Sequence, residues 1–429
     1  MASFNMISCY HAKAKGAVIL AIRRYERATP EGTRDLLFEE CAARREVEST
    51  LSRLFKARGY NRVITPTLEF FDVFDRESAG MPLETLYNVT DARGRLMVLR
   101  PDNTLPIARI AATRLRDETI PLRLFYSQNV FRRNPGLTGR RDETAQSGIE
   151  LIGASGLRAD LEILTTAVDA LEQCGAPDFR IEIGHAGFSG ALFQALEADE
   201  TLREEIAELI EMKNYAALND ALDQAGDTQA ARAIRRLPRL FGGEEVLDEA
   251  AALYNDQRAL EPLSYLRNIY RLLMQLGLQN KVNIDLGLVH RGNYYTGVVF
   301  RGYIEGSGVT VLSGGRYDGL LGEFGSPMSA TGFGVEVDAL ACAMCARGDA
   351  AAPKAADVLV FGVDGCEVRA LSYARSLNEQ GLVCENCVLD SAEAARDYAA
   401  RKGIERLDVV KEESVEIVTV NGTKGGVAQ

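Results

Sequence analysis

The chain lacks a hydrophobic run long enough to span a bilayer, which takes about 20 apolar residues. The apolar stretch at residues 16–22 is far too short. Lys13 and Lys15 precede it, as in a signal peptide, but charged residues follow at 23–27 in place of a small-residue cleavage site. We therefore expect no membrane association, a cytoplasmic protein, and a poorly ordered N-terminal extension over residues 1–28.

An excess of positive charge is also missing. The 429 residues include 49 basic and 61 acidic side chains, a net charge of −12. Such a balance gives no global attraction to nucleic-acid phosphates, although a local basic patch could still bind them. The hydrophobic content of 46% is sufficient for a sizeable core. A chain of this length is expected to form two or three domains.

Metal-binding residues are few. His185 and His290 are too far apart in sequence to propose a metal site or a catalytic base. Two CxxC pairs, at residues 342–345 and 384–387, could form a zinc site. The first pair lies in an apolar run with a helical pattern, and the second lies beside a strand-like segment. Neither has the glycine-rich turn of zinc ribbons, so we predict scattered reduced cysteines, no metal and no cofactor.

The first part of the chain has the pattern of a sheet with flanking helices. A helix is expected over residues 36–59, ending at a glycine. Pro66 cannot donate to a sheet ladder, so the strand that contains it should lie at an edge or an interface. Turns separate the expected strands, which favours a largely antiparallel sheet. These strands cover residues 63–68, 96–100, 122–126, 148–152 and 179–183.

The composition then becomes helical and later returns to strands. Residues 191–275 are rich in Ala, Leu, Glu and Arg, and strands are expected again at 282–286, 294–303 and 310–312. We predict an α+β core over residues 29–349 with a helical insertion at about 190–278. A small-residue linker follows. Alternating strands and helices after it predict a small α/β domain at 356–422.

Five separated segments, in order along the chain, resemble the histidyl-tRNA synthetases, which are class II aminoacyl-tRNA synthetases. The resemblance covers about residues 29–420 and implies the antiparallel catalytic sheet of that class. The segment at 59–71 is similar to motif 1, through which these enzymes self-associate, and 131–150 is similar to motif 2. Segments 100–104, 288–295 and 313–320 resemble the loops that bind the amino acid.

The resemblance implies a site for the backbone of a bound histidine. Asp102, Thr104 and Gln146 would face its α-amino group, and Arg132 would face its carboxylate. An ammonium group needs hydrogen-bond acceptors, and a carboxylate forms a charge-assisted bond with it. Asp102 is one methylene shorter than the family's glutamate, so this contact would shift or include a water.

The same resemblance implies a site for the imidazole ring. Glu150 would accept the ring N–H, and Tyr294, Tyr295 and Tyr317 would complete the binding segment. An apolar analogue would leave these acceptors without a partner, which gives selectivity. Taken alone, the Tyr294–Tyr295 pair is typical of cross-strand packing. The pair is interpreted as part of a binding site only because the other segments also match.

The residues that bind and activate ATP in the synthetases differ in this chain. Adenylate formation depends on positioning and on stabilising charge at phosphorus, for which the family uses arginines. Arg291 could replace one of them by a one-residue slip. The substituted positions, which would read adenine, stack on it or face the phosphates, are Asn134, Asp142, Thr144, His290 and Ala339. We therefore predict that the chain is not an enzyme.

Residues 100–109 and 293–297 also resemble the regulatory subunits of ATP phosphoribosyltransferase, the first enzyme of histidine biosynthesis. That resemblance implies assembly with a short-form catalytic subunit, in a hetero-octamer, and allosteric feedback by histidine. Residues 357–429 contain 13 acidic and 8 basic residues, a poor surface for tRNA. A divergent histidyl-tRNA synthetase and a histidine-binding scaffold with another partner are the alternatives.

Overall fold

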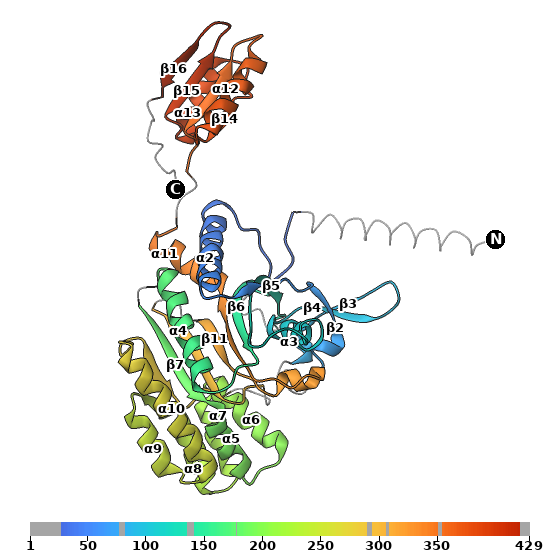
Figure 1. Cartoon of the computed structure of the whole chain (residues 1–429), viewed down its shortest axis with the longest axis vertical. Coiled ribbons are helices and arrows are strands. Elements are labelled where there is room, and N and C mark those ends of the chain that lie inside the picture. The colour runs from blue at the N-terminus through green and yellow to red at the C-terminus, as the bar shows by residue number, and fades with distance from the viewer. Residues whose placement is uncertain are drawn as a thin grey trace, which may run out of the picture. The chain divides into compact units, whose positions relative to one another are not determined.

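The computed structural model describes residues 27–76, 82–134, 141–176, 178–289, 294–305, 309–350 and 354–420. The chain divides into two compact units, the first ending at Ala350 and the second formed by the rest (Figure 1). Nearly all of the N-terminal extension expected at 1–28 lies outside the described residues. Within these residues, every helix is too short or too polar to span a bilayer.

A mixed sheet forms the centre of the first unit. Among the described residues it has nine strands in the order β1-β5-β6-β12-β11-β10-β7-β9-β8. The neighbours from β5 to β7 pair antiparallel, whereas β1 with β5 and β7 with β9 pair parallel. The strands are β1 (Asn61–Arg62), β5 (Leu122–Phe131), β6 (Glu143–Ile152), β7 (Phe179–His185), β8 (Phe241–Gly242), β9 (Val282–Asp285), β10 (Val298–Ile304), β11 (Thr310–Arg316) and β12 (Ala330–Glu336).

Helices α2 (Phe38–Ala57), α4 (Leu157–Gln173) and α11 (Val337–Arg347) pack on one face of this sheet. In α2 the buried residues Val47, Leu51 and Phe55 recur at helical spacing, which gives the helix one apolar face. The Phe55 ring meets the ring of Phe125 on β5 at 5.8 Å between centroids. The predicted helix at 36–59 is confirmed to within two residues at each end.

The opposite face of the sheet packs against α3 (Thr104–Thr113) and a short 3-10 helix, Leu320–Phe324. Side chains alternate between the two faces of a strand. On β5, Phe125 therefore joins the core with α2, while Leu124 and Tyr126 join the core with α3. Polar residues of β6 on this second face are positioned to line a site beside α3.

Six α-helices of the described chain lie between β7 and β9 in the sequence, and α10 packs against α4, α5 and β7 (Figure 1). Polar side chains at several N-caps, such as Asp199 and Thr228, accept a backbone N–H and fix where the helices start. The helices are α5 (Ala186–Ala195), α6 (Glu200–Glu211), α7 (Tyr215–Gln224), α8 (Gln229–Arg236), α9 (Glu245–Leu253) and α10 (Gln257–Gln275).

The prediction of a strand over residues 63–68 is wrong. The chain forms β1 before it and β2 (Leu68–Phe70) after it, with an irregular segment between them. Pro66 has no N–H to donate to a ladder, which explains the interruption. β2 belongs to an antiparallel three-stranded sheet in the order β2-β4-β3, with β3 at Tyr87–Thr90 and β4 at Leu96–Leu99. The strand predicted at 294–303 likewise begins only at Val298.

The second unit is a small α/β fold. Its sheet has the order β14-β13-β15-β16, in which β13 pairs parallel with β14 and β15, and β16 pairs antiparallel with β15. Two helices pack against the sheet. The elements are β13 (Val358–Gly362), α12 (Glu367–Glu379), β14 (Cys384–Asn386), α13 (Ala392–Lys402), β15 (Arg406–Val410) and β16 (Val415–Thr419).

Candidate functional site

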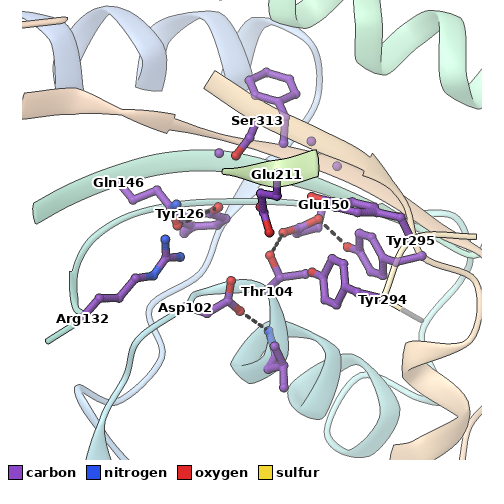
Figure 2. Close-up of a pocket in the computed structure, with 16 residues that line it drawn as sticks. Asp102, Thr104, Tyr126, Arg132, Gln146, Glu150, Glu211, Tyr294, Tyr295 and Ser313 are labelled. Atoms are coloured by element: carbon purple, nitrogen blue, oxygen red, sulfur yellow. Dashed lines mark hydrogen bonds between the residues drawn. The ribbon is translucent and has the colours of Figure 1, made fainter. Parts of the chain in front are cut away.

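A pocket of about 190 Å³ opens on the α3 face of the central sheet (Figure 2). Strands β5, β6, β11 and β12 form its floor, and the start of α3 forms one wall. All eight residues predicted from the sequence to bind histidine line it. The full lining is Asp102, Thr104, Leu105, Tyr126, Arg132, Gln146, Glu150, Glu211, Tyr294, Tyr295, Ser313, Gly314, Tyr317, Gly332, Phe333 and Gly334.

Glu150 lies at the base of this pocket and is only 1% exposed. One carboxylate oxygen accepts a hydrogen bond from the Thr104 hydroxyl at 2.8 Å, and the other accepts one from the Tyr317 hydroxyl. Burial raises the pKa of Glu150 to about 8, although both hydrogen bonds lower it. Gly332 is its partner on β12, where a Cβ would come within 1.9 Å of the carboxylate, so a side chain there would displace Glu150.

Asp102 and Arg132 lie toward one end of the pocket (Figure 2). The Asp102 carboxylate accepts the backbone N–H of Leu105 at 2.8 Å, which fixes it against the first turn of α3. Burial raises the pKa of Asp102, and the nearby Arg132 charge partly opposes this. Arg132 donates from Nε to the Pro101 carbonyl at 2.7 Å. This end of the pocket therefore offers one carboxylate and one guanidinium.

Gln146 lies four residues before Glu150 on β6, on the same face of the strand. Its amide is held by protein groups on both sides. The oxygen accepts from Asn103 Nδ2 at 3.1 Å and from the Tyr126 hydroxyl at 3.3 Å, and Nε2 donates to Glu336 at 3.2 Å. Sequence reasoning missed Asn103 and Tyr126, although Asn103 stands between two predicted residues.

Three tyrosines form the opposite wall. The rings of Tyr294 and Tyr317 stack with centroids 5.6 Å apart, and Tyr295 meets Tyr294 edge-on at 4.7 Å. Burial raises the pKa of all three hydroxyls, so they remain protonated and can donate hydrogen bonds. The wall therefore combines an aromatic surface with phenol groups, which suits a planar ring that carries polar atoms.

Glu211 was not predicted from the sequence. It is the last residue of α6, in the helical insertion, and its side chain reaches into the pocket (Figure 2). Arg301 on β10 forms an ion pair with it at 3.2 Å. No local motif marks Glu211, because its position depends on how the insertion packs against the sheet.

The positions expected to bind adenine and phosphate are occupied by groups that bind one another. Asn134 donates to the Asp142 carboxylate from both its backbone N and its Nδ2, each at 3.1 Å. The Tyr87 hydroxyl donates to the same carboxylate. Partial burial raises the pKa of Asp142, but the bonds from Tyr87 and Asn134 outweigh it and lower the pKa. A stable negative charge therefore occupies this position.

The remaining positions predicted to differ from the ATP site of the synthetases lie on β6, on α11 and outside the described residues. Thr144 lies on β6 opposite Val130 of β5, and Ala339 on α11 is partly buried against the core. His290 and Arg291 lie outside the described residues. Cys342 and Cys345 lie on α11, and no cluster of three or more metal-binding side chains occurs in the part of the chain that the structure describes.

Comparison with known proteins places the chain in a family. The family model for histidyl-tRNA synthetase matches residues 32–340. An ATP phosphoribosyltransferase regulatory subunit of Clostridium kluyveri is 39% identical over 388 residues, which cover 90% of this chain and 99% of that protein. The chain belongs to the histidyl-tRNA synthetase-like family of ATP phosphoribosyltransferase regulatory subunits. A second such subunit, from Clostridium novyi, is 37% identical over 409 residues, covering 94% of this chain and 96% of the relative.

Solved structures of this family have the same fold. A protein of Bacillus halodurans, described as an ATP phosphoribosyltransferase regulatory subunit/histidyl-tRNA synthetase, is 30% identical with a TM-score of 0.76, over 87% of this chain and 97% of that one. The histidyl-tRNA synthetase of Nostoc sp. PCC 7120 has a TM-score of 0.73 at 22% identity and covers 92% of this chain and 97% of its own. The predicted class II synthetase-like fold is confirmed.

Proposed function

We propose that the chain is a non-catalytic regulatory subunit. It assembles with a short-form ATP phosphoribosyltransferase catalytic subunit and takes part in the first step of histidine biosynthesis. The resemblance implies that this assembly is a hetero-octamer. Histidine binds in the pocket beside α3 and acts as the feedback signal. The names of the relatives support the regulatory role, and the pocket supports the ligand.

The buried Glu150 carries the ligand assignment. This carboxyl group is 1% exposed, is held in place by Thr104 and Tyr317 at the base of an open pocket, and keeps lone pairs for a ligand donor. An imidazole N–H would donate to this group, and the tyrosine wall would face the ring. Leucine and phenylalanine have no side-chain donor for Glu150, so they bind weakly.

The contacts between Asn134 and Asp142 support the absence of adenylate chemistry. Phosphoryl-group activation needs positive charge at the phosphates. By the resemblance, Asp142 stands at that position, and its carboxylate is kept ionised by Asn134 and Tyr87. The nearest alternative is a divergent histidyl-tRNA synthetase, which the family model's description favours. Histidine-dependent exchange of pyrophosphate into ATP separates the two functions.

The exposed surface of β2 supports self-association through the motif 1 segment. β2 buries the charged Glu69, which pairs with Arg109 at 2.7 Å, and exposes Leu68 and Phe70. Ile64, just before it, is 76% exposed. A strand that turns its charge inward and its apolar side chains outward is suited to an apolar partner surface, and we propose a second copy of this chain.

Isothermal titration calorimetry of the wild-type chain tests the ligand assignment. L-histidine should give saturable heat, while L-phenylalanine and L-leucine should give little. Equal heats for all three amino acids would contradict a pocket that recognises imidazole through Glu150.

A further inference from the structure

The pocket has fewer available hydrogen-bond acceptors for an amino acid than its residues suggest. An α-ammonium group donates three hydrogen bonds. Of the residues that the resemblance assigns to it, Gln146 already uses its amide oxygen for Asn103 and Tyr126. A carbonyl oxygen has two lone pairs, so Gln146 has no acceptor site left.

The other two residues supply only part of what is needed. Asp102 accepts the Leu105 N–H on one oxygen and keeps further lone pairs for the ligand. Thr104 donates its hydroxyl proton to Glu150 and can still accept one bond through its oxygen. Both residues lie at the start of α3, so they accept ammonium N–H groups on one side of the ligand only, and the remaining N–H needs an acceptor from another direction.

Glu211 is placed to be that acceptor. Figure 2 shows its side chain pointing into the pocket toward Thr104 and Glu150, from the side opposite α3. Its helix is firmly seated, because Ile206 and Ile210 of α6 are buried in the main core. The Arg301 ion pair holds the carboxylate near the sheet without burying it, since the Glu211 side chain is 36% exposed.

We infer that Glu211 accepts a hydrogen bond from the α-ammonium group of the bound amino acid, so that the helical insertion supplies a specificity residue of the site. The inference rests on the proposed function, in which the pocket binds histidine. A ligand held between Glu211 on α6 and Thr104 on α3 joins the insertion to the core. The ammonium charge is also attracted to the Glu211 carboxylate.

Calorimetry with two ligands tests this role. The probes are L-histidine and 3-(imidazol-4-yl)propionate, which has the same ring and carboxylate but no ammonium group. Glu211→Gln should weaken L-histidine binding roughly tenfold, the effect expected for loss of a charge-assisted hydrogen bond. The same substitution should change binding of the deaminated probe by less than about twofold. Glu204→Gln, on an exposed position of the same helix outside the pocket, is the matched control and should change neither affinity.

A second variant separates ligand contact from helix packing. Arg301→Gln breaks the ion pair but keeps the Glu211 carboxylate. The ratio of L-histidine affinity to deaminated-probe affinity should therefore be at least as high in this variant as in the wild type. If Arg301→Gln and Glu211→Gln weaken both ligands alike, the pair only supports the helix and the inference is wrong. Equal L-histidine affinity in wild type and Glu211→Gln would overturn the role of Glu211 but not the proposed function. No L-histidine binding to the wild type would overturn the proposed function together with the inference.

Discussion

The carboxylate of Glu150 on β6 accepts a hydrogen bond from the hydroxyl of Thr104, the first residue of α3, at 2.8 Å. The contact joins the floor of the pocket to the helix that forms its wall. Tyr317 holds the other oxygen of the same carboxylate. A ligand that changes the hydrogen bonding of Glu150 therefore acts on α3 and on β6 together.

Replacing Glu150 should remove recognition of the imidazole. Glu150→Ala is expected to weaken L-histidine binding by about 1–3 kcal/mol, because the ring N–H loses its buried acceptor. Calorimetry measures the change, and Glu393→Ala, at an exposed position in the first turn of α13, is the control. An equal loss in both variants would show that the effect is not local to the pocket.

The raised pKa of Glu150 gives the stability of the chain a pH dependence. Burial raises this pKa to about 8, whereas an unfolded glutamate titrates near about 4.3. The folded state therefore holds an extra proton between these values. The stabilisation is complete below the unfolded pKa and is lost as the pH rises through about 8.

Thermal unfolding of wild type and Glu150→Gln measures this contribution. The variant cannot titrate at this position, so its melting temperature should fall less from about pH 5 to about pH 9. Burial also raises the pKa of Glu182 to about 7, but this residue is present in both proteins and cancels in the difference. Parallel curves for the two proteins would mean that Glu150 titrates normally.

The chain should not catalyse histidine-dependent exchange of pyrophosphate into ATP. By the resemblance, Asp142 stands where the synthetases have a cation facing the phosphates, and its carboxylate, stabilised by Asn134 and Tyr87, would repel them. An authentic histidyl-tRNA synthetase assayed in parallel is the positive control. Exchange at a comparable rate would support the synthetase alternative and refute a regulatory role without chemistry.

A charge on the exposed face near β2 should weaken self-association. Ile64→Lys places an ammonium group at a position that is 76% exposed in the single chain, in the same segment as the exposed Leu68 and Phe70. The dimer dissociation constant from analytical ultracentrifugation should rise by about tenfold or more, since a charge is costly to bury. Val388→Lys, at a 90% exposed position of the second unit, should leave it unchanged. Weaker association of Val388→Lys with unchanged association of Ile64→Lys would indicate that the interface lies on the second unit.

Much of the pocket could be predicted because its residues occur in short motifs. Gln146 and Glu150 lie four apart on one strand, Asp102 lies two residues before Thr104, and Thr104 is the first residue of α3, so local spacing brings each pair to the same site. Glu211 could not be found in this way. It reaches the pocket through packing of the insertion helices, and nothing in its neighbouring sequence indicates that packing.

The strand boundaries show the same limit. The predicted strands at 122–126 and 148–152 are the inner parts of β5 and β6, which extend as a longer hairpin. The unpredicted parts, residues 127–131 of β5 and 143–147 of β6, contain polar residues that do not have a strand-like pattern. Asn129 and Glu143 satisfy each other across the pair, with Nδ2 donating to the carboxylate at 2.6 Å. Such cross-strand compensation depends on register, which single-residue propensities do not give.

Histidine bound in this pocket is proposed to regulate a catalytic partner. The most direct measurement is the ATP phosphoribosyltransferase activity of the short catalytic subunit, alone and with this chain, over a range of L-histidine concentrations. We predict that the wild-type chain raises activity and that L-histidine then lowers it several-fold, as couplings of about 1–3 kcal/mol imply. The double variant Glu150→Ala with Asp102→Ala should still assemble and activate, because neither residue lies on the exposed β2 face, but should be inhibited much less. Unchanged inhibition of that variant in an intact complex would show that histidine acts at another site.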